Sequence, residues 1–165
     1  LAVNKLIILL IFHEMGFPLL KRQVTDIVLQ NNLINYIDLQ QSFHELEKLQ
    51  MIQKVKNKEQ FVISKIGQQT IISLAERIPN DITELIRNYT AGNKDSIRLE
   101  NQIFTSYIKK SDTEYIVVLK VVENDITLIE LKLNVVSALQ AKQICAKWKQ
   151  SHSLIYNQVI NTLIK

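Results

Sequence analysis

Four polar side chains that can contact nucleic acid occur close together: Gln40, Gln41, His44 and Lys48. Glutamine can pair with adenine through two hydrogen bonds, while histidine and lysine can donate to base edges or to phosphates. Two acids, Glu45 and Glu47, lie among them and would be repelled by a phosphate backbone. The segment is therefore either a base-reading surface or a solvated helix face, and the residues that flank it favour base reading.

A lysine-rich segment follows at once. From Lys48 to Lys65 the chain has five basic residues and one acid, a local excess of +4 that equals the net charge of the whole chain. Two β-type runs, 51–55 and 60–63, enclose the turn that carries Lys56 and Lys58, and Lys54 stands just before it, so the pattern predicts a short hairpin. Lysines at its tip would contact phosphates and add salt-dependent affinity. Lysines on an edge strand also discourage aggregation, so this reading stays open as well.

The polar residues at 40–48 are predicted to lie on an amphipathic helix. Apolar side chains at 39, 43, 46 and 49 form one buried stripe. Asp38 is the expected N-cap of this helix, with Gln41 completing a variant capping box.

Two further helices are predicted upstream, over the apolar run 3–12 and over 21–29, separated by a Gly-Phe-Pro turn at 16–18. Arg22 stands at the start of the second helix and is a candidate phosphate contact. Three helices followed by a hairpin is the order of a winged helix-turn-helix, which places its last helix in the DNA major groove.

The remainder of the chain predicts an α+β domain. A helix over 64–78, with Ile66 on its inner side, ends at Pro79; a second begins at Asn80, pauses near 91–93 and continues over 94–101. Period-two runs at 103–109, 115–123 and 126–134 predict a three-stranded antiparallel sheet, followed by helices over 137–150 and 154–164. The expected domains are therefore 1–78, a winged helix-turn-helix, and 79–165.

Composition narrows the class of protein. The 165 residues are 47% hydrophobic, enough for one large core or two small ones, and the pI near 9.1 is compatible with a nucleic-acid partner. A single cysteine, Cys145, excludes an internal disulfide and fits a cytoplasmic location. The N-terminal apolar run is shorter than the ~20 residues of a membrane span, so no membrane partner is expected.

No residue pattern predicts catalysis. The three histidines, at 13, 44 and 152, lack metal-ligand spacing, and phosphate-binding, dinucleotide-binding and nucleophile-elbow motifs are absent from the sequence. We therefore expect a protein that is not an enzyme and that needs neither a metal nor a cofactor.

Residues 4–9, 35–41, 127–134 and 141–148 resemble corresponding stretches of a family of bacterial, mainly clostridial-type, proteins. That family has a domain of unknown function with a winged-helix N-terminus, and the resemblance covers nearly the whole chain. It implies a bacterial cytoplasmic protein that regulates transcription.

A broader resemblance is to PadR and MarR regulators, which use a dimeric winged helix. Their helix after the wing commonly opens with Thr/Ser-x-x-Gly, matched here by Ser64 and Gly67, although the lysine that often precedes the glycine is replaced by Ile66.

The sequence thus predicts a regulator that binds double-stranded DNA through Arg22, Gln40, Gln41, His44, Lys48, Lys54, Lys56 and Lys58. The broad apolar stripe at 154–164 is either core or the seam of a homodimer. The alternative function is a protein–protein interaction module that has the winged-helix fold but no DNA surface, as the acids at 45 and 47 and the modest net charge would suggest.

Overall fold

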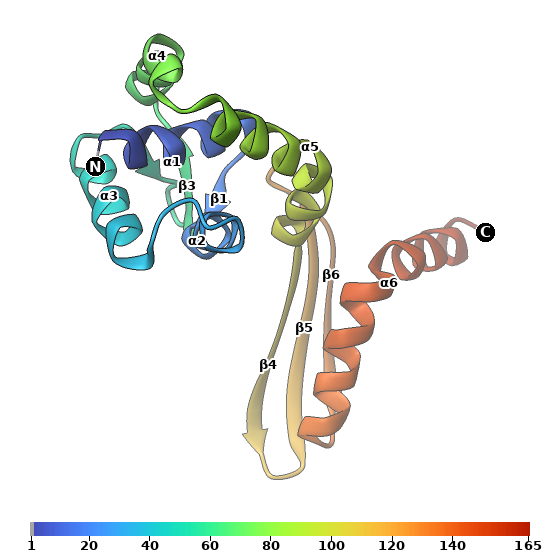
Figure 1. Ribbon diagram of the computed structural model, residues 1–165. Helices are drawn as coiled ribbons and strands as arrows, with labels where there is room; N and C mark the ends of the chain where they lie inside the picture. The colour runs from blue at the N-terminus through green and yellow to red at the C-terminus, as the bar shows by residue number, and fades with distance from the viewer. Residues whose placement is uncertain (1) are drawn as a thin grey trace. The chain divides into compact units, whose positions relative to one another are not determined.

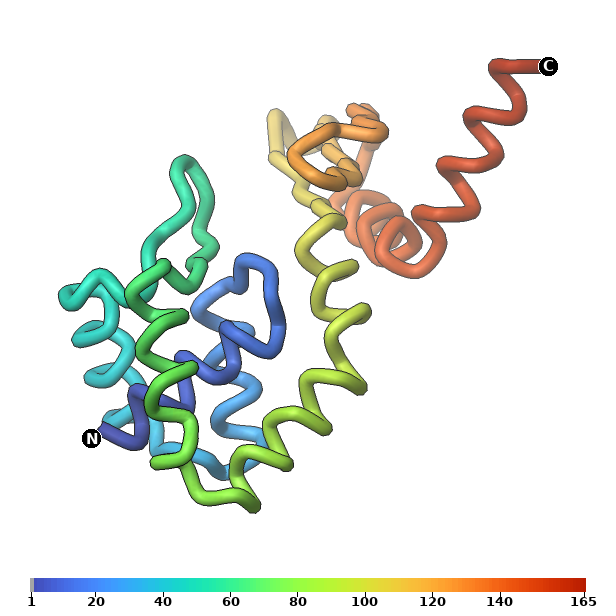
Figure 2. The backbone as a smooth tube through the Cα atoms, turned by 90° about the horizontal axis from the view of Figure 1, so that it is seen from above, coloured from blue at the N-terminus to red at the C-terminus, as the bar shows by residue number. Residues whose placement is uncertain are grey.

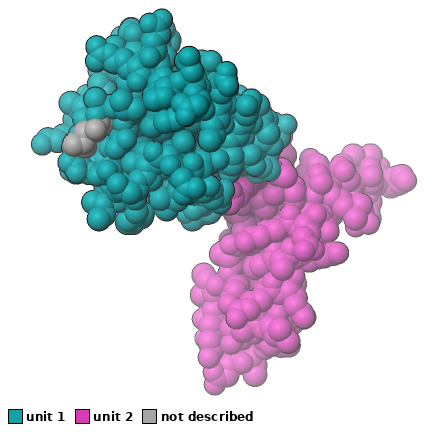
Figure 3. Space-filling model, viewed as in Figure 1, with its two compact units in different colours: residues 1–98 teal, residues 99–165 magenta. Residues whose placement is uncertain are grey.

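A computed structural model describes residues 2–165. Over these residues the protein is a mixed α+β structure with six α-helices and two three-stranded antiparallel sheets (Figure 1). The chain divides into two compact units, one ending at Arg98 and the other running from Leu99 to Lys165 (Figure 3). Each unit has its own hydrophobic core.

The first unit holds the elements that precede and include most of α5, and Figure 2 follows their path. In chain order they are α1 (Ala2–Met15), β1 (Leu19–Leu20), α2 (Lys21–Gln30), α3 (Tyr36–Lys48), β2 (Ile52–Lys54), β3 (Gln60–Ile63), α4 (Lys65–Leu74), the 3-10 turn η1 (Ala75–Arg77) and α5 (Asn80–Gln102). β3 pairs with both β2 and β1, giving the strand order β1-β3-β2. The predicted hairpin is confirmed by the pairing of β2 with β3.

α1 is the central helix of the first core. Every residue from Leu6 to Phe12 is buried, as is Met15. A helix that is apolar on all sides is stable only when other elements surround it, and α3, α4, β3 and η1 pack against this one. Phe43 of α3 stacks edge-on against Phe61 of β3, which ties the hairpin to the same core.

The predicted pause at 91–93 is wrong, because α5 runs without a break from Asn80 to Gln102. Ile86 is fully buried in the first core and Tyr89 packs against it, so tertiary packing holds the helix together through Gly92. Ile78 is also buried in that core. The expected boundary at Pro79 therefore falls inside the first compact unit, and the division lies between Arg98 and Leu99.

The second unit contains the predicted three-stranded sheet. β4 (Ile103–Ser111), β5 (Glu114–Glu123) and β6 (Ile126–Val135) form an antiparallel meander with β5 in the centre. Asn124 and Asp125, both with positive φ, connect β5 to β6, as expected for a two-residue hairpin turn. Val117 and Leu119 are buried on the face that α6 covers.

α6 (Ala138–Ile164) consists of two helical segments joined across a kink at Ser151, which confirms the break predicted between the helices over 137–150 and 154–164. Its first part packs on the sheet through Ala141 and Trp148, and Ser137 caps it by accepting a hydrogen bond from the Gln140 N–H. Ser151 has non-helical backbone angles and lies between the two segments. None of the described helices is long and apolar enough to cross a membrane.

Candidate functional site

Helix α3 presents a line of exposed side chains on the side away from the core. Leu39, Ser42, Phe43 and Leu46 are its buried residues. At 100° per residue, the opposite side carries Ile37, Gln41, His44 and Lys48, all of which are exposed. Gln40 lies on a flank of the helix and is half-buried. Three of the four predicted contact residues of α3 therefore share the most accessible line, and the fourth lies beside it.

The N-cap of α3 is Asn35, and the prediction of Asp38 is wrong. The Asn35 side-chain oxygen accepts a hydrogen bond from the Asp38 N–H at 2.9 Å, and its amide donates to the Asp38 carboxylate at 2.6 Å. The helix consequently begins at Tyr36, three residues earlier than an N-cap at Asp38 would allow. Gln41 does not complete a capping box, because its amide donates to Glu45 at 3.1 Å.

Glu45 is neutralised by a residue that the sequence did not single out. Lys5 of α1 forms an ion pair with its carboxylate at 2.6 Å. The hydrogen bond from Lys5, and then that from Gln41, hold the pKa of Glu45 below its ordinary value. Lys5 lies 40 positions before Glu45 in a mostly apolar helix. A lysine in such a run was the only sequence feature that could have pointed to a charged partner. Glu47 has no such partner among the described residues and remains a negative charge on the flank of Gln40.

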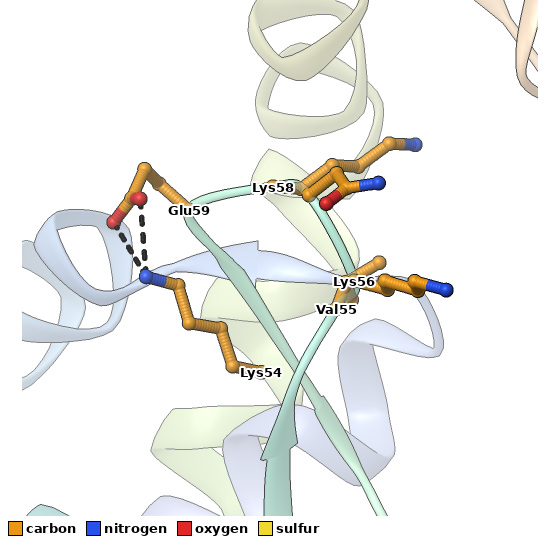
Figure 4. A pocket seen from close by; sticks show the side chains of 6 residues that line it. Lys54, Val55, Lys56, Lys58 and Glu59 are labelled. Atoms are coloured by element: carbon orange, nitrogen blue, oxygen red, sulfur yellow. Dashed lines mark hydrogen bonds and ion pairs between the residues drawn. The ribbon is translucent and has the colours of Figure 1, made fainter.

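The hairpin separates its lysines into two groups. Lys54 forms an ion pair with Glu59 at 3.0 Å, across the two strands. Lys56 and Lys58 project from the turn on the other side, away from this pair (Figure 4). Asn57, between them, has φ of 61°, which a turn at this position requires. The turn thus exposes Lys56 and Lys58 to solvent on one side of the hairpin, and Lys54 pairs with Glu59 on the other.

Two basic residues begin α2. The Arg22 guanidinium lies 3.1 Å from the carboxylate of Asp26, one turn along the helix. The Lys21 ammonium lies 4.9 Å from the centre of the Phe43 ring, a cation–π contact that links α2 to α3. Arg22 is exposed, so a phosphate could exchange with Asp26 as its partner.

The Ser64-x-x-Gly67 motif fixes the hairpin against α4. The Ser64 hydroxyl caps α4 by accepting a hydrogen bond from the Gly67 N–H, and the Ser64 N–H donates to the Met51 carbonyl at 2.9 Å. A Cβ at Gly67 would overlap that carbonyl, so only glycine allows the close approach. Ile66 is 51% exposed, and the expectation that it faces the core is wrong.

Among the described residues, no three His, Cys, Asp or Glu side chains gather in an arrangement that could hold a metal ion. The polar groups that the structure brings together are those of α3 and the hairpin turn. They can donate hydrogen bonds and hold anions.

A family model described as a domain of unknown function, DUF4364, matches residues 4–163. No curated protein and no solved structure matches the chain. Because the match covers almost the full length, the chain belongs to the DUF4364 family.

Proposed function

We propose that the first unit is a winged helix-turn-helix and that the protein is a DNA-binding transcriptional regulator of the cytoplasm. The observation that carries this proposal is the succession of α3, with its exposed polar line, and a hairpin whose turn presents Lys56 and Lys58 to solvent. The order α1-β1-α2-α3-β2-β3 and the sheet order β1-β3-β2 are those expected of the winged fold.

In this proposal Gln40, Gln41 and His44 read base edges, while Lys48, Lys56 and Lys58 hold phosphates. Arg22 and Lys54 would contribute by exchanging Asp26 and Glu59 for phosphate oxygens. The Lys5–Glu45 pair supports the assignment, since it removes one of the two acidic charges that would repel DNA from α3.

The proposal is tested by fluorescence anisotropy with random-sequence duplex DNA at ~50 and ~200 mM salt. Each phosphate contact contributes about 0.9 to the slope of log K against log salt, so Lys56→Ala with Lys58→Ala should weaken binding and reduce the slope by roughly 2. Lys109→Ala with Lys110→Ala removes the same charge from the β4–β5 hairpin and serves as the matched control. Equal losses in the two double variants would refute a contact by the β2–β3 turn.

A second candidate is a protein–protein interaction module. Glu47 favours it, because its uncompensated carboxylate lies on the same flank of α3 as Gln40, two turns further along the helix. This alternative requires that the wild-type protein fail to bind duplex DNA at either salt concentration.

We also propose that two copies associate through the C-terminal part of α6. Leu154, Leu163 and Ile164 are 59%, 77% and 79% exposed there. Residues 151–164 contain no Asp, Glu, Lys or Arg, so a second copy would meet no like charge. Sedimentation should give a dimer for the wild-type protein and a monomer for Leu154→Glu with Leu163→Glu; a wild-type monomer at tens of micromolar would refute it.

A further inference from the structure

The C-terminal part of the chain carries lysines and no acids. Glu130 is the last acidic residue, and residues 131–165 contain five lysines. Three of these, Lys142, Lys147 and Lys149, lie on the first part of α6. The basic bias of the protein is therefore not confined to the hairpin of the first unit.

These three lysines point away from the sheet. α6 packs on the sheet through Ala141 and Trp148, with Ile144 and Cys145 beside them. Lys142, Lys147 and Lys149 are exposed, and none has an ion-pair partner among the described residues. By contrast, Lys5, Arg22, Lys54, Arg87 and Lys109 are each paired with an acid.

The lysines border an uncharged strip along the outer side of the helix. The strip consists of Leu139, Gln143, Ala146 and Gln150, spaced four, three and four residues apart. This is the spacing of the contact positions of a coiled coil. Lys142 and Lys149 then lie on one side of the contact positions and Lys147 on the other. These flanking positions correspond to e and g of a coiled coil, where charges determine the choice of partner helix. We call residues 139–150 on this side the lysine-bordered strip.

The pattern does not stabilise α6 itself. Acidic residues in the first turn would interact favourably with the helix dipole, and Glu–Lys pairs four residues apart would add stability. α6 has neither. Leu139 at the start of the strip is 67% exposed, which gives an apolar contact point next to the charges. An acidic, amphipathic partner would satisfy both the lysines and the exposed leucine.

We propose that the lysine-bordered strip docks an acidic amphipathic helix of another protein. A second copy of this chain fits poorly, because parallel or antiparallel pairing would place lysine against lysine. The phosphates of nucleic acid would contact the lysines but would offer no apolar surface to Leu139. A membrane surface would need the apolar side of this part of α6, which already packs on the sheet.

The test uses the full chain and a labelled 28-residue peptide with leucine at the coiled-coil contact positions and glutamate at the bordering positions. A matched peptide carries lysine in place of glutamate. In anisotropy titrations at ~50 mM salt, we expect binding of the glutamate peptide only. Lys142→Gln, Lys147→Gln and Lys149→Gln together should weaken it about tenfold, as three exposed ion pairs would predict. Leu139→Gln should weaken it several-fold, which purely electrostatic attraction would not.

The Lys56→Ala with Lys58→Ala variant should bind the glutamate peptide as the wild type does, and the triple α6 variant should bind duplex DNA as the wild type does. Unchanged emission of Trp148 establishes that the α6 variants keep their packing. Failure to bind the glutamate peptide, equal binding of both peptides, or loss of DNA binding in the triple variant would each overturn the proposal. It does not depend on the first unit binding DNA.

Discussion

At Gly67 the start of α4 approaches the backbone of Met51 so closely that a Cβ would overlap the Met51 carbonyl oxygen and lie 2.8 Å from Ile63 Cγ1. Gly16 requires glycine for a different reason: it follows the last residue of α1 and has a φ of 74°, in the left-handed region that glycine adopts without strain. Gly92 has neither a close approach nor a positive φ: it lies inside α5, and beyond its chain neighbours and the adjacent backbone of that helix no atom lies within 4 Å of the Cβ it would carry.

These surroundings predict opposite effects of the same substitution. Gly67→Ala should destabilise the protein by about 1–3 kcal/mol, because backbone must move to admit the methyl group. Gly92→Ala should stabilise it by about 1 kcal/mol, because alanine favours the helix and restricts the unfolded chain. Urea unfolding followed by circular dichroism measures both. A loss of stability in Gly92→Ala would contradict the open space around this residue.

The Lys5–Glu45 pair predicts how stability depends on pH. Because the folded protein lowers the pKa of Glu45, the unfolded chain takes up a proton there at a higher pH. The stabilising contribution is complete above the ordinary carboxyl pKa of about 4.5 and is lost as pH falls through the lower folded value. Lys5→Gln should therefore flatten the fall in the urea midpoint between about pH 5 and pH 3.

Lys94→Gln is the control for that comparison. The Lys94 ammonium donates to the backbone carbonyl of Glu14 rather than to a carboxylate. Its loss should shift the midpoint by a similar amount at every pH. If Lys5→Gln shows the same pH-independent shift, Glu45 is not the titrating partner of Lys5.

At the scale of elements, α3 begins at a cap that two residues could have supplied. Asn35 and Asp38 are both good N-cap residues, three positions apart, and the sequence offers no local reason to choose between them. The choice follows from burial, because Leu39 must reach the core while Ile37 stays exposed.

Removing the cap should loosen the whole helix that bears the polar line. Asn35→Ala should cost about 1 kcal/mol, since it leaves the Asp38 N–H without its acceptor. Asn35→Ser retains an acceptor oxygen and should cost less. Thermal unfolding of the two variants provides the measurement, and equal losses would show that the cap bond contributes nothing to stability.

Elements with a strong local signal were predictable. The three strands of the second unit alternate with period two, and β5 is joined to β6 at Asn124–Asp125, where both residues have positive φ. The caps at Ser64 and Ser137 were likewise readable from their sequence. Contacts between residues distant in the sequence were not predictable. No local pattern indicates that Lys5 pairs with Glu45, or that the packing of Ile86 keeps α5 helical through Gly92.

The break predicted between the two C-terminal helices is likewise present, at Ser151. Serine is disfavoured inside a helix, and the backbone at Ser151 departs from helical angles between the two segments. On the candidate site, the sequence identified exposed residues well but could not tell paired from unpaired cations. In the sequence Lys54 and Lys56 are equivalent lysines, and only the structure shows that Lys54 pairs with Glu59.

At the scale of the whole molecule, the two cores differ in size. The first is a large cluster around α1, and the second is a small one in which Val117, Leu119 and Trp148 are the main members. A smaller core buries less apolar surface and resists unfolding less well. The second unit should therefore unfold first.

The single tryptophan makes that order measurable. Trp148 is 1% exposed in the second core, so its emission reports on the second unit alone. Helical circular dichroism reports largely on the first unit, which contains five of the six helices in full or in large part. We expect the emission change at a lower urea concentration than the dichroism change. Superimposable transitions would instead mean that the two units unfold cooperatively.

α5 begins on the first core and passes directly into β4 at Ile103, with no loop between them. Deletion mapping would therefore misassign activities in this protein. A fragment that stops at Ile78 loses Ile86, which completes the first core, and one that stops at Arg98 ends inside a helix. Loss of function in either truncation would report unfolding rather than the absence of a partner. Genetic dissection of this family requires point substitutions on the surfaces of intact chains.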